Sequence, residues 1–173
     1  MLCRVSEPPC FNARIWIVNR ETANRVVELF VNRSQLDRVL SADDAAVRAC
    51  LDRALHRLKA AEVLRDAELL ESAFTNAYDA YRTAADALVL MLGYRVPATP
   101  GGHRIATDIA HAALQASTVA FAPASAERFR QGRHESEYFD PDRPVEKTVA
   151  DTTWALGLAN DAVDAVTASL SVS

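Results

Sequence analysis

Apolar residues recur every three or four positions through most of the chain after residue 40, and this spacing predicts a series of amphipathic helices. The first is expected to start at Ser41, because a serine followed by acidic residues suits a helix N-terminus, and to end near residue 64. The second is expected over residues 67–93, ending at Gly93 before two prolines. The positions expected to be buried in these two helices are Val47, Leu51, Ala54, Leu55, Leu58, Ala61, Leu70, Phe74, Ala77, Tyr78, Tyr81, Ala85, Leu88 and Met91.

Three further helices are expected in the second half of the chain. One covers residues 103–118 and is followed by Pro123, which cannot continue it. Ser125 is the expected cap of the next helix, and the last helix covers residues 145–170. The positions expected to be buried here are Ile105, Ile109, Ala112, Ala113, Ala116, Val149, Trp154, Leu156, Leu158, Ala162, Val163 and Val166.

The N-terminal segment gives a weaker pattern. Residues 13–18 suit a short strand, and an alternative is one helix over residues 15–31. That helix would bury Ile15, Val18, Val26, Leu29 and Phe30. We therefore divide the chain into an N-terminal arm or extension, residues 1–40, and a helical domain, residues 41–173. The fold class is all-α, an antiparallel bundle of about five helices.

Charge and cysteine content narrow the function classes. The net charge is −4, so the whole molecule is not drawn to nucleic acid, and any RNA contact needs a local basic patch. Three cysteines without a CxxC pair argue against a disulfide framework and a zinc site. The N-terminus lacks a signal-peptide pattern, and no run of eighteen apolar residues occurs. We expect a cytoplasmic protein with no membrane contact, no metal and no cofactor.

Alanine dominates several of the expected buried stripes, including that of residues 103–118. Alanines allow helices to approach closely but each buries little apolar area, so the core is thin. Additional burial in a homodimer would compensate, and we expect this chain to form one.

The densest group of functional side chains lies between Arg128 and Tyr138. On a helix, Arg130, His134 and Tyr138 are spaced at i, i+4 and i+8 and share one face. Arg128 precedes His134 by six residues, which turn an ideal helix by about 240°. These two side chains meet only if the helix is broken between them, and Gly132 lies where such a break would occur.

The segments Ala77–Arg82, Gly102-His103-Arg104 and Arg128–Pro141 resemble the HEPN (higher eukaryote and prokaryote nucleotide-binding) superfamily. These are compact all-α domains of bacterial and archaeal defence and toxin–antitoxin systems, and many are metal-independent endoribonucleases with an Arg-x4–6-His motif. The resemblance implies catalytic roles for Arg128 and His134, paired across a two-fold dimer. We expect the remaining cations and the phenol of the segment to bind the substrate, namely Arg130, Arg133 and Tyr138.

Two features leave an alternative open. Phe129 follows the motif arginine where active members have a polar residue, and Tyr138 lies four residues after His134 rather than two. Relatives with such a changed motif are thought to bind a nucleotide or a protein partner such as a nucleotidyltransferase. In a toxin–antitoxin system the partner would be the cognate antitoxin.

A third interpretation assigns no function to the segment. Acidic residues lie around the arginines, and Arg133 and Glu137 form an i, i+4 pair typical of a solvated helix face. Elsewhere, His103 is expected to order a helix start, and Tyr78 and Tyr81 are expected to pack in the core.

Overall fold

The computed structural model describes residues 18–39, 44–98, 101–138, 141–142 and 146–170. Within these ranges the chain forms six helices and one two-stranded antiparallel sheet, which confirms the all-α class. The helices are α1 (Arg20–Asn32), α2 (Asp44–Asp66), α3 (Leu70–Met91), α4 (Gly102–Leu114), α5 (Pro123–Glu137) and α6 (Val149–Leu170), and the strands are β1 (Asp37–Arg38) and β2 (Tyr94–Arg95).

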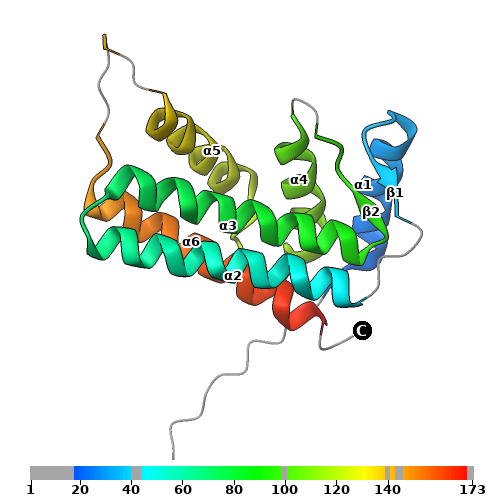
Figure 1. Ribbon diagram of the computed structural model, residues 1–173. Helices are drawn as coiled ribbons and strands as arrows, with labels where there is room; N and C mark the ends of the chain where they lie inside the picture. Colours follow the sequence, from blue (N-terminus) through cyan, green and yellow to red (C-terminus); the bar gives the residue numbers. More distant parts are fainter. Residues whose placement is uncertain (1–17, 40–43, 99–100, 139–140, 143–145, 171–173) are drawn as a thin grey trace, which may run out of the picture.

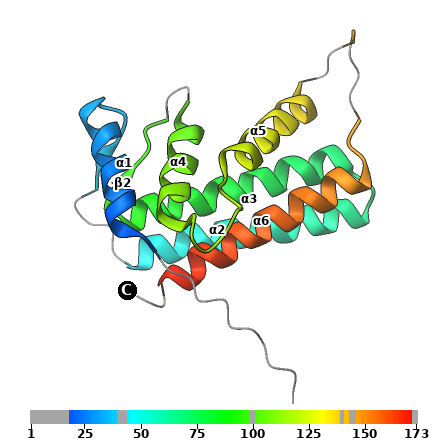
Figure 2. The same ribbon diagram turned by 180° about the vertical axis from the view of Figure 1, so that it is seen from behind.

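The three long helices α2, α3 and α6 lie side by side, and α2 runs opposite to the other two (Figure 1). The shorter helices α1, α4 and α5 stand on one side of this layer, as both views show (Figures 1 and 2). Helix α3 is central, because it packs against α2, α4, α5 and α6. Buried residues therefore occur around most of its circumference rather than along one stripe.

Helix α1 belongs to the predicted N-terminal extension and packs on α4. The Asn19 side chain caps α1 by accepting from Thr22 N, and Asn19 N donates to the carbonyl of Ala113 in α4. Phe30 is buried, as expected, whereas Leu29, which was also expected to be buried, is 46% exposed. That expectation was wrong because α1 touches the domain along its Ala23–Val27–Phe30 edge. Residues 13–17 of the predicted strand lie outside the described residues.

The expected helices occur with shifted ends. Three residues expected to be buried in them are exposed, and four are only half-buried, Leu70, Met91, Trp154 and Leu158. Leu55 is 45% exposed because α2 contacts its neighbours along a narrow seam of every third or fourth residue. Val149 is 61% exposed in the first turn of α6. Ala116 is exposed and lies beyond the end of α4.

Helix α5 begins at Pro123 with Ala122 as its N-cap, so the prediction of a Ser125 cap was wrong. Proline fits the first position of a helix, where its missing N–H has no intrahelical partner to lose. The expected cap of α2, Ser41, lies outside the described residues. Gly93 follows α3 with a φ of 87°, the left-handed conformation that favours glycine at a helix end.

Candidate functional site

Helix α5 is unbroken from Pro123 to Glu137, so the break at Gly132 that would let Arg128 and His134 meet is absent. Gly132 serves close packing instead, because a Cβ placed on it would lie 2.8 Å from Phe74 Cε1 of α3. An unbroken helix keeps Arg128 and His134 on different sides of α5. Within one protomer, the structure does not bring the two predicted catalytic residues together.

Arg128 faces α6. Its guanidinium carbon lies 4.0 Å from the ring centroid of Trp154, which is a cation–π contact, and its Nη2 is 4.0 Å from Asp151 Oδ1. The Arg128 side chain remains 59% exposed. Its described contacts are therefore with the last helix.

His134 and Tyr138 lie at the exposed C-terminal end of α5, with ring centroids 4.8 Å apart. Tyr138 is the C-cap, with an extended backbone conformation, so it leaves the helix rather than continuing the face of Arg130 and His134. The i, i+4, i+8 alignment expected for these three residues is therefore incomplete.

Phe129 is fully buried and anchors α5 to the core. Its ring packs against four aromatic rings at centroid distances of 5.1–5.3 Å, those of Phe74, Tyr78, Tyr81 and Trp154. The departure from a polar residue after the motif arginine thus has a packing reason, since this position points into the core.

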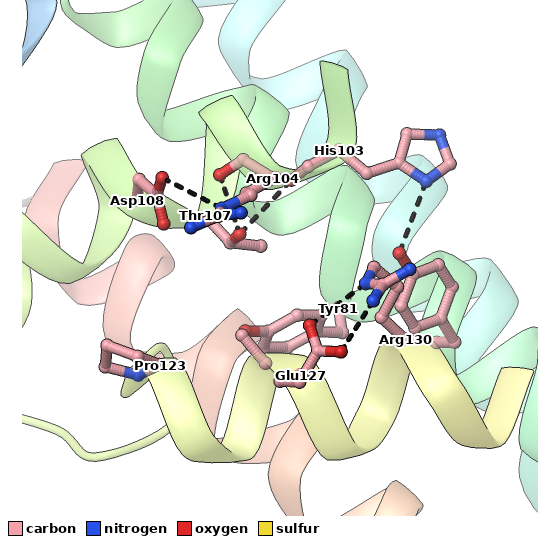
Figure 3. A pocket seen from close by; sticks show the side chains of 10 residues that line it. Tyr81, His103, Arg104, Thr107, Asp108, Pro123, Glu127 and Arg130 are labelled. Atoms are coloured by element: carbon pink, nitrogen blue, oxygen red, sulfur yellow. Dashed lines mark hydrogen bonds and ion pairs between the residues drawn. The ribbon is translucent and has the colours of Figure 1, made fainter. Parts of the chain in front are cut away.

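A pocket of about 240 Å³ opens between α3, α4 and α5 (Figure 3). It has both charges and aromatic surface among its lining residues, which are Tyr78, Tyr81, His103, Arg104, Thr107, Asp108, Pro123, Ala126, Glu127 and Arg130. Of the predicted site residues, Arg130 lines this pocket.

His103 at the start of α4 connects two residues of α3. Its Nε2 lies 2.5 Å from Arg82 Nη1, and its Nδ1 lies 3.2 Å from the Tyr78 hydroxyl. A guanidinium can only donate, so Nε2 accepts and His103 is neutral with its proton on Nδ1. Burial and the nearby cations Arg82 and Arg133 lower the pKa of His103, in agreement with this state.

The proton on Nδ1 is donated to the Tyr78 oxygen, which leaves the phenolic O–H of Tyr78 free to donate elsewhere. Burial raises the pKa of Tyr78, so this hydroxyl keeps its proton. Tyr78, which lines the pocket, therefore keeps its O–H as a donor, and Arg82 holds this arrangement in place through His103.

Each cation near the pocket has an acidic partner. Arg130 donates to Glu127 at 2.5 and 3.1 Å, and this hydrogen bond lowers the pKa of Glu127. Arg133 lies with its guanidinium 5.4 Å from the Tyr78 ring centroid and donates to Glu137, which confirms the expected i, i+4 pair. The pocket wall is therefore polar and nearly neutral.

Tyr81 contributes a second phenol. Its side chain is 1% exposed, and its hydroxyl has no hydrogen-bond partner among the described residues. Asp108 lines the same pocket, and its pKa is raised by burial, against the effect of Arg104. Burial, Tyr78 and Asp108 raise the pKa of Tyr81 well above its usual range.

Sequence reasoning missed His103 as a site residue, although the Gly102-His103-Arg104 segment was part of the family resemblance. Tyr78 and Tyr81 are buried, as expected, and both also line the pocket. Helical periodicity assigns a side chain to the interior without indicating where its polar end lies.

The helical arrangement and the matched sequence define the class of protein. The model of the HEPN domain family matches residues 47–166, which covers α2 to α6 apart from their outermost turns. The chain belongs to the HEPN family. No match was found among curated proteins or among solved structures.

The described ranges contain no group of three or more His, Cys, Asp or Glu residues arranged to hold a metal ion. None of their helices is both long enough and apolar enough to cross a membrane.

Proposed function

We propose that this chain is a HEPN module that binds a nucleotide in the pocket between α3, α4 and α5 and does not cleave RNA by itself. The observation that carries the proposal is the Arg82–His103–Tyr78 chain, which leaves the Tyr78 O–H as a donor on a residue that lines the same pocket as Arg130. Arg128 and His134, by contrast, lie on separate sides of an unbroken helix.

A phosphate group would bind through directed hydrogen bonds rather than through a strong positive field. Arg130 is bonded to Glu127, and both side chains are more than half exposed, so the pair can separate at little cost. The planar guanidinium then offers a phosphate two parallel donors. The Tyr78 hydroxyl would supply a further donor to the same group or to the ribose.

The test is calorimetric titration of the purified protein with AMP, using Arg130→Ala and Arg128→Ala as matched variants. Both remove an exposed arginine from α5, but only Arg130 lines the pocket. Binding weakened about tenfold by Arg130→Ala and unchanged by Arg128→Ala is the expected result. Absence of AMP binding to the wild-type protein would overturn the proposal.

A metal-independent endoribonuclease is the second candidate. The observation that favours it is the exposure of both motif residues, since His134 is exposed and Arg128 is 59% exposed. His134 of one protomer is therefore accessible to Arg128 of a second protomer. Cleavage of total RNA in EDTA by the wild-type protein, lost in His134→Ala, would establish this activity and replace the binding-only proposal. Light scattering of the same samples tests the homodimer that this mechanism requires.

We further propose that the module acts in the bacterial cytoplasm with a protein partner, such as a nucleotidyltransferase that serves as its antitoxin. Support comes from family membership alone. Co-expression with the product of the neighbouring gene, followed by affinity purification, tests the partnership. Recovery of the HEPN chain without that product would argue against it.

A further inference from the structure

The buried hydroxyl of Tyr81 is the starting point. Nearly all buried polar atoms in folded proteins have a hydrogen-bond partner, and leaving one without a partner costs stability. The Tyr81 ring is fixed by packing against Phe121 and Phe129, with centroids 5.1 Å away in each case. The hydroxyl points into the space between α4 and α5 (Figure 3), and it finds no partner among the described residues.

Asp108 lies at the same end of the pocket as this hydroxyl, on the α4 side (Figure 3). Its described ion pair is with Arg104, at 3.8 Å, and the Arg104 side chain is 82% exposed. Such a long and solvated contact leaves the carboxylate able to accept from a ligand. The neighbouring Thr107 hydroxyl already donates to the carbonyls of its own helix.

The two ends of the pocket thus differ in chemistry. His103 and Arg130 lie at one end, and Asp108 lies at the other, with Tyr81 between the helices (Figure 3). The Tyr78 hydroxyl belongs to the first end, because it is 3.2 Å from His103 Nδ1. A ligand that satisfies both ends has acceptor oxygens on one side and an N–H donor next to an acceptor on the other. A nucleotide has this arrangement when its base carries an amino group beside an unprotonated ring nitrogen.

We propose that Tyr81 and Asp108 select the base of the bound nucleotide, an inference that rests on the proposed function. The Tyr81 hydroxyl donates to the ring nitrogen, and the Asp108 carboxylate accepts from the exocyclic amino group. Adenine and cytosine present this pair of groups. Hypoxanthine and uracil present a carbonyl and a ring N–H instead, so both hydrogen bonds would be replaced by mismatched contacts.

The ligand test compares AMP with IMP, and CMP with UMP, by calorimetry on the wild-type protein. Each pair differs in the exocyclic group and in the protonation of the adjacent ring nitrogen. The amino-bearing member is expected to bind about tenfold more tightly or better, because a site built around buried polar groups rejects ligands that leave them unpaired. Equal affinities within both pairs would overturn the inference.

The variant test uses Tyr81→Phe, which removes only the hydroxyl, and Asp108→Asn. Because the hydroxyl has no described partner, Tyr81→Phe is expected to leave the melting temperature unchanged or slightly raised. It should nevertheless reduce the preference for AMP over IMP by about tenfold. A loss of stability with an unchanged preference would show that the hydroxyl serves the fold, and would overturn the inference.

The two proposals fail differently. If AMP and IMP bind equally and Arg130→Ala weakens both, nucleotide binding stands and base selection by Tyr81 and Asp108 is overturned. If neither nucleotide binds, both proposals fall.

Discussion

Gly132 of α5 packs directly against the edge of the Phe74 ring of α3, and the space for a Cβ at this glycine is already occupied by ring carbons of Phe74. The contact fixes how closely α5 approaches the central helix. Phe129, three residues earlier, packs on the same Phe74 ring with centroids 5.3 Å apart. Together these contacts hold the α5 wall of the pocket at its distance from α3.

Gly132→Ala is therefore expected to destabilise the protein by about 1–3 kcal/mol, because the added methyl group has to displace Phe74 or the whole helix. Gly157→Ala in α6 is the matched control, since nothing lies within 4 Å of its Cβ position. An alanine there should stabilise the protein by about 0.5–1 kcal/mol through helix propensity. Urea denaturation of both variants provides the measurement, and a stabilising Gly132→Ala would contradict the packing argument.

The stability of the wild-type protein should fall as the pH is lowered from about 7.5 to 5.5. The pKa of His103 is lowered in the fold from its ordinary 6.5, so in this range the unfolded chain binds more protons and acid favours unfolding. Protonated His103 can no longer accept from Arg82. Melting temperatures across this range, compared between wild type and His103→Gln, should show a flatter dependence in the variant.

The comparison with the variant is needed because other titrating groups on α3 and α4 change the stability in the opposite direction. Burial raises the pKa values of Asp86 and Asp108, so their protonation in acid favours the folded state. The difference between the two proteins removes these shared contributions. The same dependence of melting temperature on pH in the two proteins would argue against a neutral His103 that accepts from Arg82.

The chain has two lysines, Lys59 and Lys147, and they should differ strongly in their contribution to stability. Lys147 is 8% exposed, its Nζ lies 2.7 Å from Glu135 Oε2, and it lies 4.9 Å from the Phe74 ring centroid. Lys147→Ala should cost about 1–3 kcal/mol, since it removes both a charge-assisted hydrogen bond and the packing of the stem.

Lys59→Ala serves as the control, because its ion pair with Glu62 is at the surface and its side chain is 75% exposed. A cost below about 0.5 kcal/mol is expected there. Similar costs for the two lysines in chemical denaturation would indicate that the contacts of Lys147 contribute little. Lys147→Met, which keeps the stem, should recover part of the loss.

Arg128→Ala should change the environment of Trp154 without changing nucleotide affinity. The guanidinium covers the indole ring, so its removal should alter the tryptophan fluorescence and cost about 0.5–1 kcal/mol. AMP titration of the same variant should give the wild-type affinity. A parallel loss of affinity would place Arg128 in the nucleotide site and revive the motif-based assignment.

The long helices could be predicted because their burial follows the helical period. In α3, the aromatic and alanine positions that the sequence places on one stripe are buried. The pairing of Asp37 with Arg95 could not be predicted, because two-residue strands carry no periodic signal and the partners are 58 residues apart. Leu29 and Leu55 were misassigned because the sequence does not distinguish an apolar residue at the edge of a helix–helix contact from one at its centre.

The site was harder to predict than the fold for a physical reason. The Arg128–His134 spacing describes one segment, whereas the pocket is formed by side chains from three helices. Gly132 was interpreted through its backbone freedom, and its importance lies in a contact with a residue of another helix. Such tertiary contacts determine both the pocket and the protonation state of His103, and neither is encoded by local spacing.

The alanines of α3 also limit how this protein can diverge. All six have no exposed surface, Ala73, Ala77, Ala80, Ala84, Ala85 and Ala87. A larger side chain at any of these positions would push a neighbouring helix outward. Changes in the shape of the pocket, whether reached by drift or by a mutant library, are therefore expected to arise from exchanges on α4 and α5 rather than at these alanines of α3.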